Sequence, residues 1–177
     1  MASPHHLATQ AGLLVLRNGG SAVDAAIATN AALAVVAGHS CGLGGDAFWI
    51  IWDAERQEAV TLNGSGRAGS QASIEAARAA GHERVPERGA WSITVPGAVH
   101  SWGEAHRRFG RLDWSALLAA AIDLASGFPA SQGWLDAVER STAVIGPNGH
   151  RASVYRPEDR ARKPGDNAVS YTQQTLP

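Results

Sequence analysis

Apolar residues recur at helical spacing near the start of the chain and predict a first helix. The positions that set this spacing are Leu7, Ala11, Leu14 and Val15. Ser3 and Pro4 precede them as an N-cap and a first-turn proline, and Asn18-Gly19-Gly20 ends the pattern. We therefore expect a helix that is capped by Ser3 and ends at the Asn18-Gly19-Gly20 segment.

A second helix is expected to be buried, because its residues are small and apolar on most sides. Ser21 stands at its N-cap and Asp24 follows three residues later, in the place of the acidic residue of a capping box. The apolar residues that follow are Ala25, Ala26, Ile27, Ala31, Leu33, Ala34, Val35 and Val36. A helix without a polar face packs on several sides, so this one is predicted to lie in the core.

β-branched and aromatic residues predict an antiparallel hairpin in the middle of the chain. They fill residues 47–53 and 59–62, and the polar segment 53–57 joins the two runs. Glycine clusters lie on both sides of this hairpin, at residues 41–46 and 63–69. Glycine allows a backbone to approach a ligand or another backbone closely, so these loops are candidates for a binding site.

Beyond the hairpin the pattern predicts four helices and one strand. In chain order these are a helix over residues 73–80, a strand over 91–95, and helices over 98–109, 113–126 and 131–144. Gly81, Gly110 and Gly127 stand where three of the helices end, Asp113 caps one of them, and Pro96 ends the strand. We expect residues 1–149 to form one incomplete domain and the polar residues 150–177 to be a connector that continues into further sequence.

Composition excludes several classes of protein. The chain has 177 residues, 45% of them hydrophobic, and a formal net charge of −1, which does not favour nucleic acid binding. No apolar run is long enough for a membrane helix and no signal peptide is visible, so the chain is expected to be cytoplasmic with no membrane partner. The single cysteine, Cys41, excludes an internal disulfide framework and a multi-cysteine metal site.

Cysteine and histidine do not form a convincing catalytic or metal-binding pattern. Cys41 and His39 are two residues apart, so their side chains are not expected to face each other, and a free cysteine is commonly a small buried hydrophobe. His100 and His106 are six residues apart and do not share one helical face. We therefore expect neither a metal nor a cofactor.

The segment Gly64-Ser65-Gly66-Arg67-Ala68-Gly69 matches the G-x-G-x-x-G pattern of dinucleotide-binding sites. It follows a predicted strand and precedes a predicted helix, as such a site requires. That strand is, however, the second arm of a hairpin, and no second strand–helix repeat follows. A nucleotide-binding, Rossmann-like oxidoreductase fragment therefore stays open as an alternative function.

Several segments together resemble the gamma-glutamyltranspeptidase family of N-terminal-nucleophile hydrolases. In order they are residues 2–9, 17–26, the glycine turn 41–46, residues 63–68, residues 94–99 with Trp102, residues 109–112 with Trp114, and residues 127–129. Their joint occurrence over nearly the whole chain is far more specific than any one motif. The resemblance implies an α+β fold, the αββα sandwich of this hydrolase type, present here as its helix-rich N-terminal portion with a short β-hairpin.

The resemblance also implies a precursor that cuts itself into a large and a small subunit. The nucleophile of the family is a threonine at the start of the small subunit, whose α-amino group serves as the base. Thr172 and Thr175 lie near the end of the chain but lack the threonine-threonine-histidine sequence of the cleavage site. The catalytic residue is therefore expected outside this chain, and the missing small subunit is its expected partner.

Substrate binding is the one function that the resemblance places within the chain. Many members hold the α-carboxylate of the substrate with an arginine just after the second hairpin strand, a task that suits a bidentate guanidinium. Ser65 occupies that position here, and Arg67 follows two residues later. Asp46 likewise stands where such members carry glycine. Ser65 and Arg67 are the candidate substrate-binding residues.

These features predict a gamma-glutamyltransferase-like amide-bond hydrolase or acyltransferase that forms a covalent acyl-enzyme. Its expected substrate is a small molecule, a glutathione-type gamma-glutamyl peptide or another amide, because Ser65 departs from the glutamyl-binding pattern. The segment alone is expected to be inactive. A non-catalytic remnant or partner subunit is the remaining alternative.

Overall fold

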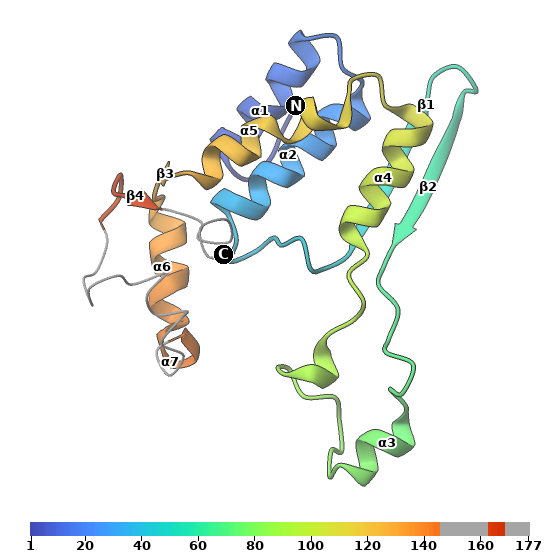
Figure 1. Cartoon of the computed structure of the whole chain (residues 1–177), viewed down its shortest axis with the longest axis vertical. Helices are drawn as coiled ribbons and strands as arrows, with labels where there is room; N and C mark the ends of the chain where they lie inside the picture. Colours follow the sequence, from blue (N-terminus) through green and yellow to red (C-terminus); the bar gives the residue numbers. More distant parts are fainter. Residues whose placement is uncertain (146–162, 169–177) are drawn as a thin grey trace. The chain divides into compact units, whose positions relative to one another are not determined.

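The computed structural model describes residues 1–145 and 163–168 (Figure 1). The chain divides into two compact units, Met1–Gly42 with Phe109–Pro177 and Leu43–Arg108. The predicted boundary between a domain and a connector, at residues 149 and 150, lies outside the described residues. None of the helices in the described ranges is long and apolar enough to cross a membrane.

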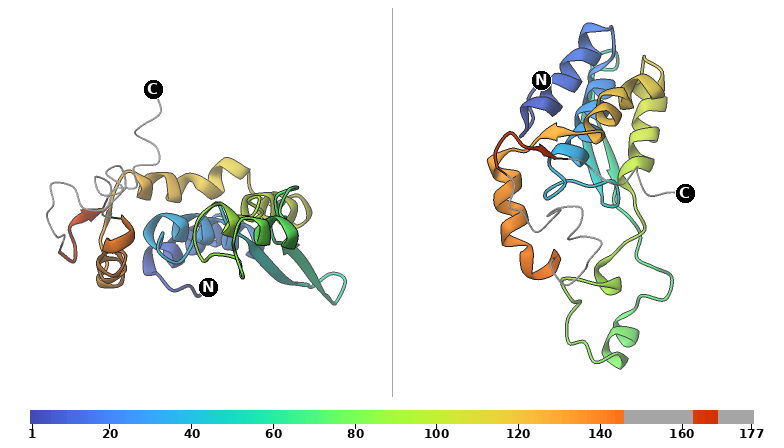
Figure 2. Two further views of the ribbon diagram at one scale, coloured as in Figure 1. Left: turned by 90° about the horizontal axis from the view of Figure 1, so that it is seen from below. Right: turned by 60° about the vertical axis from the view of Figure 1, so that its left-hand side comes forward.

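Three helices form the main body of the first unit. They are α1 (His6–Arg17), α2 (Ala22–Val36) and α5 (Trp114–Ala125), and α2 packs against both of the others (Figures 1 and 2). Ten residues of α2 are buried, which confirms the prediction of a core helix. Four of these ten buried residues are alanines, Ala25, Ala28, Ala31 and Ala32, whose small side chains leave room for neighbouring helices.

The N-cap of the first helix lies two residues later than predicted, at His5 and not at Ser3. The N-cap is His5, whose Nδ1 accepts a hydrogen bond from the Leu7 amide at 3.3 Å, whereas the Ser3 hydroxyl contacts Thr9 Oγ1 at 2.7 Å. The Ser3 hydroxyl donates to the His5 carbonyl at 3.0 Å, so Ser3 packs against the first turn and does not cap its amides. Burial lowers the pKa of His5, helped by the charges of His6 and His39, which favours the neutral ring in which Nδ1 can accept.

The predicted capping box at the start of α2 is present. The Asp24 amide donates to Ser21 Oγ at 3.1 Å, and the Ser21 amide donates to Asp24 Oδ2 at 2.9 Å. The same carboxylate oxygen accepts from the amides of Arg111 and Leu112, at 2.9 and 3.3 Å. Asp24 therefore ties the start of α2 to the turn before α5, 87 residues away along the chain.

The predicted helix over residues 131–144 is wrong as a single element. It is two helices, α6 (Gln132–Arg140) and α7 (Thr142–Ile145). Ser141 leaves the helical conformation with φ −92° and ψ 3°, and its amide is shared between the carbonyls of Ala137 and Val138. The Thr142 hydroxyl also donates to Val138 O, and such side-chain bonds compete with regular helix pairing.

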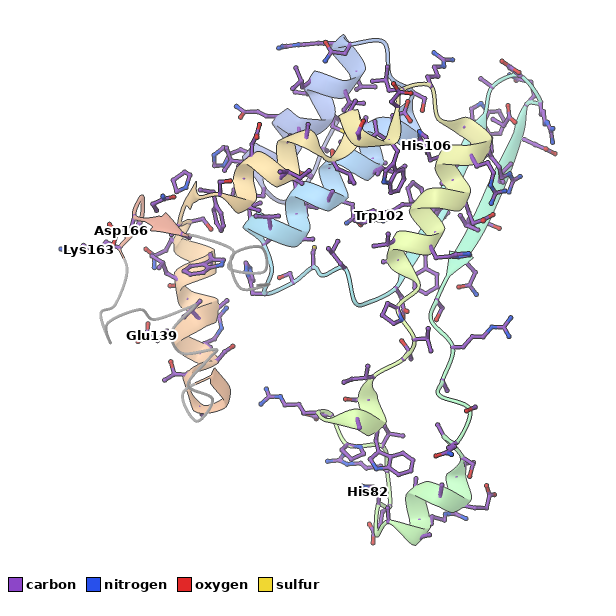
Figure 3. The ribbon with its side chains drawn as sticks, viewed as in Figure 1. His82, Trp102, His106, Glu139, Lys163 and Asp166 are labelled. Atoms are coloured by element: carbon purple, nitrogen blue, oxygen red, sulfur yellow. The ribbon has the colours of Figure 1, made fainter. Side chains whose placement is uncertain are left out.

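A short pair of strands in this unit has no counterpart among the predicted elements. Strand β3 (Phe128–Pro129) pairs antiparallel with β4 (Asn167–Ala168). Lys163 and Asp166, labelled in Figure 3, form the turn before β4, where the Lys163 amide donates to Asp166 Oδ2 at 2.8 Å. Part of the predicted polar connector thus returns to the first unit and pairs with it.

The second unit contains the predicted hairpin. Strand β1 (Ala47–Asp53) pairs antiparallel with β2 (Glu58–Gly64), from Ala47 opposite Gly64 to Asp53 opposite Glu58. One face of this hairpin carries Phe48, Ile50 and Trp52, which are 71%, 85% and 62% exposed. Within the described residues this apolar strand face is left open to solvent.

The segment between β2 and α4 (Ala98–Phe109) differs from its prediction in one element. Helix α3 (Ile74–Ala79) forms with Ser73 as its cap, but residues 91–95 do not form a strand. A 3₁₀ turn, η1 (Ala90–Ser92), stands there instead, closed by the bond from the Ser92 amide to Gly89 O. His82, labelled in Figure 3, packs edge-on against Trp91 in this segment, with ring centroids 5.7 Å apart.

The β-branched residues that suggested a strand lack a partner to pair with. Val95 makes one backbone bond to the Arg67 carbonyl, at 2.9 Å, and Pro96 has no amide hydrogen to extend a ladder. Extended residues with a single bond of this kind anchor a loop but do not form a sheet. Helix α4 then begins at Ala98, as predicted.

Candidate functional site

Three backbone segments meet in the second unit at the start of α4. They are the glycine turn 44–46 before β1, the loop 63–67 after β2, and the segment 95–98. The Gly45 carbonyl accepts hydrogen bonds from the amides of Gly97 and Ala98, at 3.1 and 2.9 Å. Ala98 is the first residue of α4, where helix N–H groups have no partner within the helix, and Gly97 directly precedes it. The glycine turn therefore caps α4 through its backbone.

Glycine is required where the loop 63–67 meets the segment 95–98. A Cβ on Gly66 would overlap the Val95 carbonyl oxygen, and a Cβ on Gly97 would overlap the Gly64 carbonyl oxygen. Both obstacles are backbone atoms, which cannot rotate away as a side chain can. Gly66 of the second glycine cluster thus serves close packing of one backbone on another.

The hairpin is fixed to α4 beneath this loop. The Trp49 indole Nε1 donates to Ser101 Oγ at 3.0 Å, and the Ser101 hydroxyl donates to Ala98 O at 2.7 Å. Ser101 is buried, and its side chain lies against Gly64 at the end of β2. The base of the loop 63–67 is therefore held by one buried and one partly buried hydrogen bond.

Three further hydrogen bonds hold the loop itself. Asn63 Oδ1 accepts from the Ser65 amide at 2.9 Å, Asp46 Oδ1 accepts from the Gly66 amide at 2.7 Å, and the Arg67 carbonyl accepts from the Val95 amide at 2.9 Å. Three successive residues of the loop are thus each held by a different residue, Asn63, Asp46 or Val95. The side chains of residues 65 and 67 are therefore attached to a restrained backbone.

Comparison with known proteins identifies the family. The Gamma-glutamyltranspeptidase family model matches residues 8–174. The chain belongs to this family. It is 39% identical over 169 residues to the glutathione hydrolase-like YwrD proenzyme of Bacillus subtilis, covering 94% of this chain and 32% of that protein. It is 46% identical over 121 residues to the oxamate amidohydrolase proenzyme of Klebsiella pneumoniae, covering 68% of this chain and 22% of that protein.

The gamma-glutamyltranspeptidase fold is confirmed by a solved structure. The crystal structure of Helicobacter pylori gamma-glutamyltranspeptidase matches with a TM-score of 0.86 and 28% identity, covering 95% of this chain and 49% of that one. The chain therefore has the predicted α+β fold of the N-terminal-nucleophile hydrolases, as the N-terminal part of the large subunit. It spans about a third of the Bacillus subtilis relative. The antiparallel hairpin also differs from the parallel strands of a Rossmann unit.

Both predicted substrate-binding residues of this transpeptidase-type chain lie in the fixed loop. Ser65 and Arg67 are exposed on either side of Gly66. The Arg67 guanidinium makes no hydrogen bond or ion pair with another side chain in the described part of the protein. Their roles in binding stay predictions, and the structure places them on one rigid backbone segment.

Asp46 is the functional candidate that the sequence pattern alone did not assign. Its carboxylate reaches 20 residues along the chain to the loop that carries Ser65 and Arg67. The signal available in the sequence was an aspartate at the end of the glycine turn 41–46. The sequence did not predict that Asp46 binds the Gly66 amide, because that contact depends on the register of the β1–β2 hairpin.

The threonines of the described residues lie within or beside regular elements. Thr9 lies in α1, Thr29 is buried in α2, and Thr61 lies in β2. Thr172 and Thr175 lie outside the described residues. Cys41 is half-buried against the core of the first unit, as expected for a small hydrophobe.

Proposed function

We propose that this chain is the front part of a gamma-glutamyltranspeptidase-type enzyme that hydrolyses amide bonds or transfers their acyl group. The reaction passes through a covalent acyl-enzyme on a threonine of the small subunit, which then reacts with water or an acceptor amine. The precursor cuts itself to release that threonine, and it acts in the cytoplasm without a cofactor. The observation that carries the proposal is the family match over residues 8–174.

The proposed substrate is a small amide that carries a carboxylate. One relative is named a glutathione hydrolase-like protein and another an oxamate amidohydrolase, and both names refer to small molecules with a carboxylate and an amide. The exposed Arg67 guanidinium suits such an anion, because it forms two parallel hydrogen bonds with a carboxylate. Ser65 adds a hydroxyl on the same loop.

The proposed partner of this chain is the remaining part of the precursor. The apolar face of the hairpin formed by Phe48, Ile50 and Trp52 supports this proposal, since side chains of this size rarely stay exposed together on one strand face. The chain spans 32% of the Bacillus subtilis relative, which leaves ample sequence to cover this face.

We expect the isolated 177-residue chain to show no turnover of a gamma-glutamyl anilide above the rate in buffer. Residues that bind a substrate cannot replace an absent nucleophile. The measurement is release of the chromogenic aniline from the pure chain, and the precursor restored with its downstream part is the positive control. Catalysis by the chain alone would overturn the assignment of the nucleophile to the small subunit.

In the restored precursor, Arg67→Ala is expected to raise KM for an acidic amide substrate about tenfold, with little change in kcat. Loss of a charge-assisted hydrogen bond costs about 1.5–3 kcal/mol, and each 1.4 kcal/mol is a factor of ten. The measurement is steady-state kinetics with oxamate and a gamma-glutamyl anilide. Arg78→Ala, an exposed arginine of α3, is the matched control, and equal kinetics of the two variants would refute a binding role for Arg67.

A further inference from the structure

The loop that carries Ser65 and Arg67 depends on a glycine that is both necessary and flexible. Gly66 is necessary because a side chain there would overlap the Val95 carbonyl oxygen. Glycine also has the widest range of backbone conformations, so its rotation would redirect the side chains on both sides of it. The loop therefore needs a constraint that acts on Gly66 without adding a Cβ.

The Asp46 carboxylate supplies such a constraint. Its Oδ1 accepts the Gly66 N–H at 2.7 Å, a short distance typical of a bond to a charged acceptor. The other two bonds of the loop hold the Ser65 amide and the Arg67 carbonyl, so Asp46 is the side chain that holds the central peptide.

Asp46 is itself held by its neighbours on both sides. Gly45 accepts two amide hydrogen bonds from the start of α4, and Ala47 begins β1 opposite Gly64. The backbone that carries the carboxylate is therefore tied to the start of α4 and to the end of β2. A carboxylate on a fixed backbone can in turn fix the peptide that it binds.

We propose that Asp46 is a positioning residue that holds Gly66, and through it Arg67, in the orientation that binds the carboxylate of a small amide substrate. This inference rests on the proposed function and names the residue that sets its substrate affinity. The effect of Asp46 is transmitted by a hydrogen bond, so an acceptor oxygen at this position is what matters. Asparagine retains that oxygen and alanine does not.

The first test follows the Gly66 amide without any substrate. In the 177-residue chain, hydrogen exchange at Gly66, observed by NMR, is expected to be about tenfold faster in Asp46→Ala than in the unchanged chain, because a hydrogen bond of about 1.4 kcal/mol is lost. In Asp46→Asn the exchange rate at Gly66 is expected to stay close to that of the unchanged chain. Asp53→Ala is the matched control, because Asp53 ends β1 and accepts from the amides of Glu55 and Arg56 at 3.0 and 3.2 Å. An unchanged Gly66 rate in Asp46→Ala would overturn the proposal.

The second test uses kinetics of the restored precursor. Asp46→Ala is expected to raise KM for an acidic amide about tenfold with kcat within about twofold, while Asp46→Asn recovers most of the affinity. Adding Asp46→Ala to Arg67→Ala is expected to cause little further loss, since the first residue acts through the second. Asp53→Ala should leave KM unchanged.

Two kinetic outcomes would overturn the proposal. One is an Asp46→Asn variant as impaired as Asp46→Ala, which would mean that charge and not position matters. The other is full additivity of Asp46→Ala and Arg67→Ala, which would mean that they act independently. A restored precursor that hydrolyses no amide would instead overturn the proposed function, and the exchange rate at Gly66 would still decide whether Asp46 fixes the loop.

Discussion

Replacement of Asp24 by alanine is expected to destabilise the chain by about 3–5 kcal/mol, a large part of the 5–15 kcal/mol that holds a typical domain together. Asp24 is fully buried. Its Oδ2 accepts hydrogen bonds from the amides of Ser21, Arg111 and Leu112. A helix cap alone is worth about 1 kcal/mol, and hydrogen bonds to a charged acceptor add about 1.5–3 kcal/mol. The loss is therefore larger than that of an ordinary cap, because α2 and the turn before α5 are released together.

The measurement for Asp24 is urea unfolding followed by circular dichroism. Asp123→Ala is the matched control, since Asp123 is an exposed aspartate within α5, and it is expected to change the free energy of unfolding by less than about 0.5 kcal/mol. Asp24→Asn keeps an acceptor oxygen, so its free energy of unfolding should lie between those of Asp24→Ala and Asp123→Ala. A free energy of unfolding for Asp24→Ala equal to that of the control would show that the three amides find other partners.

Asp24 also shows how far the sequence could predict this fold. Its capping box with Ser21 was predictable, because both partners lie within one helical turn and the pattern is local. Its bonds to Arg111 and Leu112 were not, because they join segments 87 and 88 residues apart. Sequence periodicity describes a helix and its ends, and says little about which distant turn a buried carboxylate will meet.

The errors in the predicted elements have the same cause. Residues 91–95 have the composition of a strand, but composition does not supply a pairing partner, and Val95 finds a single carbonyl. Strand β4 was missed because two residues carry no periodicity, and it forms only by pairing with β3 far earlier in the chain. The hairpin and α4 were predicted well because their signals are long and local.

The candidate site was predicted in part for the same reason. The resemblance placed Ser65 and Arg67 after the second hairpin strand, and they do lie in that loop. The hold of Asp46 on Gly66 depends on β1 and β2 pairing in the register that sets Ala47 opposite Gly64. A shift of register would have moved the carboxylate away from the loop.

In the restored precursor, Gly66→Ala is expected to lower kcat/KM by about 100-fold for amide substrates. The new Cβ would overlap the Val95 carbonyl oxygen. The loop 63–67 must therefore move away from the segment 95–98, whose Val95 amide donates to the Arg67 carbonyl. A displacement of about 1 Å in a residue that positions the substrate can cost about 10²-fold in rate. The site is held by backbone-to-backbone contact, and one methyl group is enough to disturb it.

Measuring both stability and kcat/KM of Gly66→Ala separates a displaced loop from an unfolded chain. Overpacking is expected to destabilise the chain by about 1–3 kcal/mol, which leaves it folded, and thermal unfolding measures this. Gly69→Ala is the matched control, because no atom lies within 4 Å of the position of its Cβ. It should retain both stability and kcat/KM. If Gly66→Ala kept the kcat/KM of the unchanged precursor, the loop 63–67 would not contact the substrate, and Ser65 and Arg67 would lose their proposed roles together.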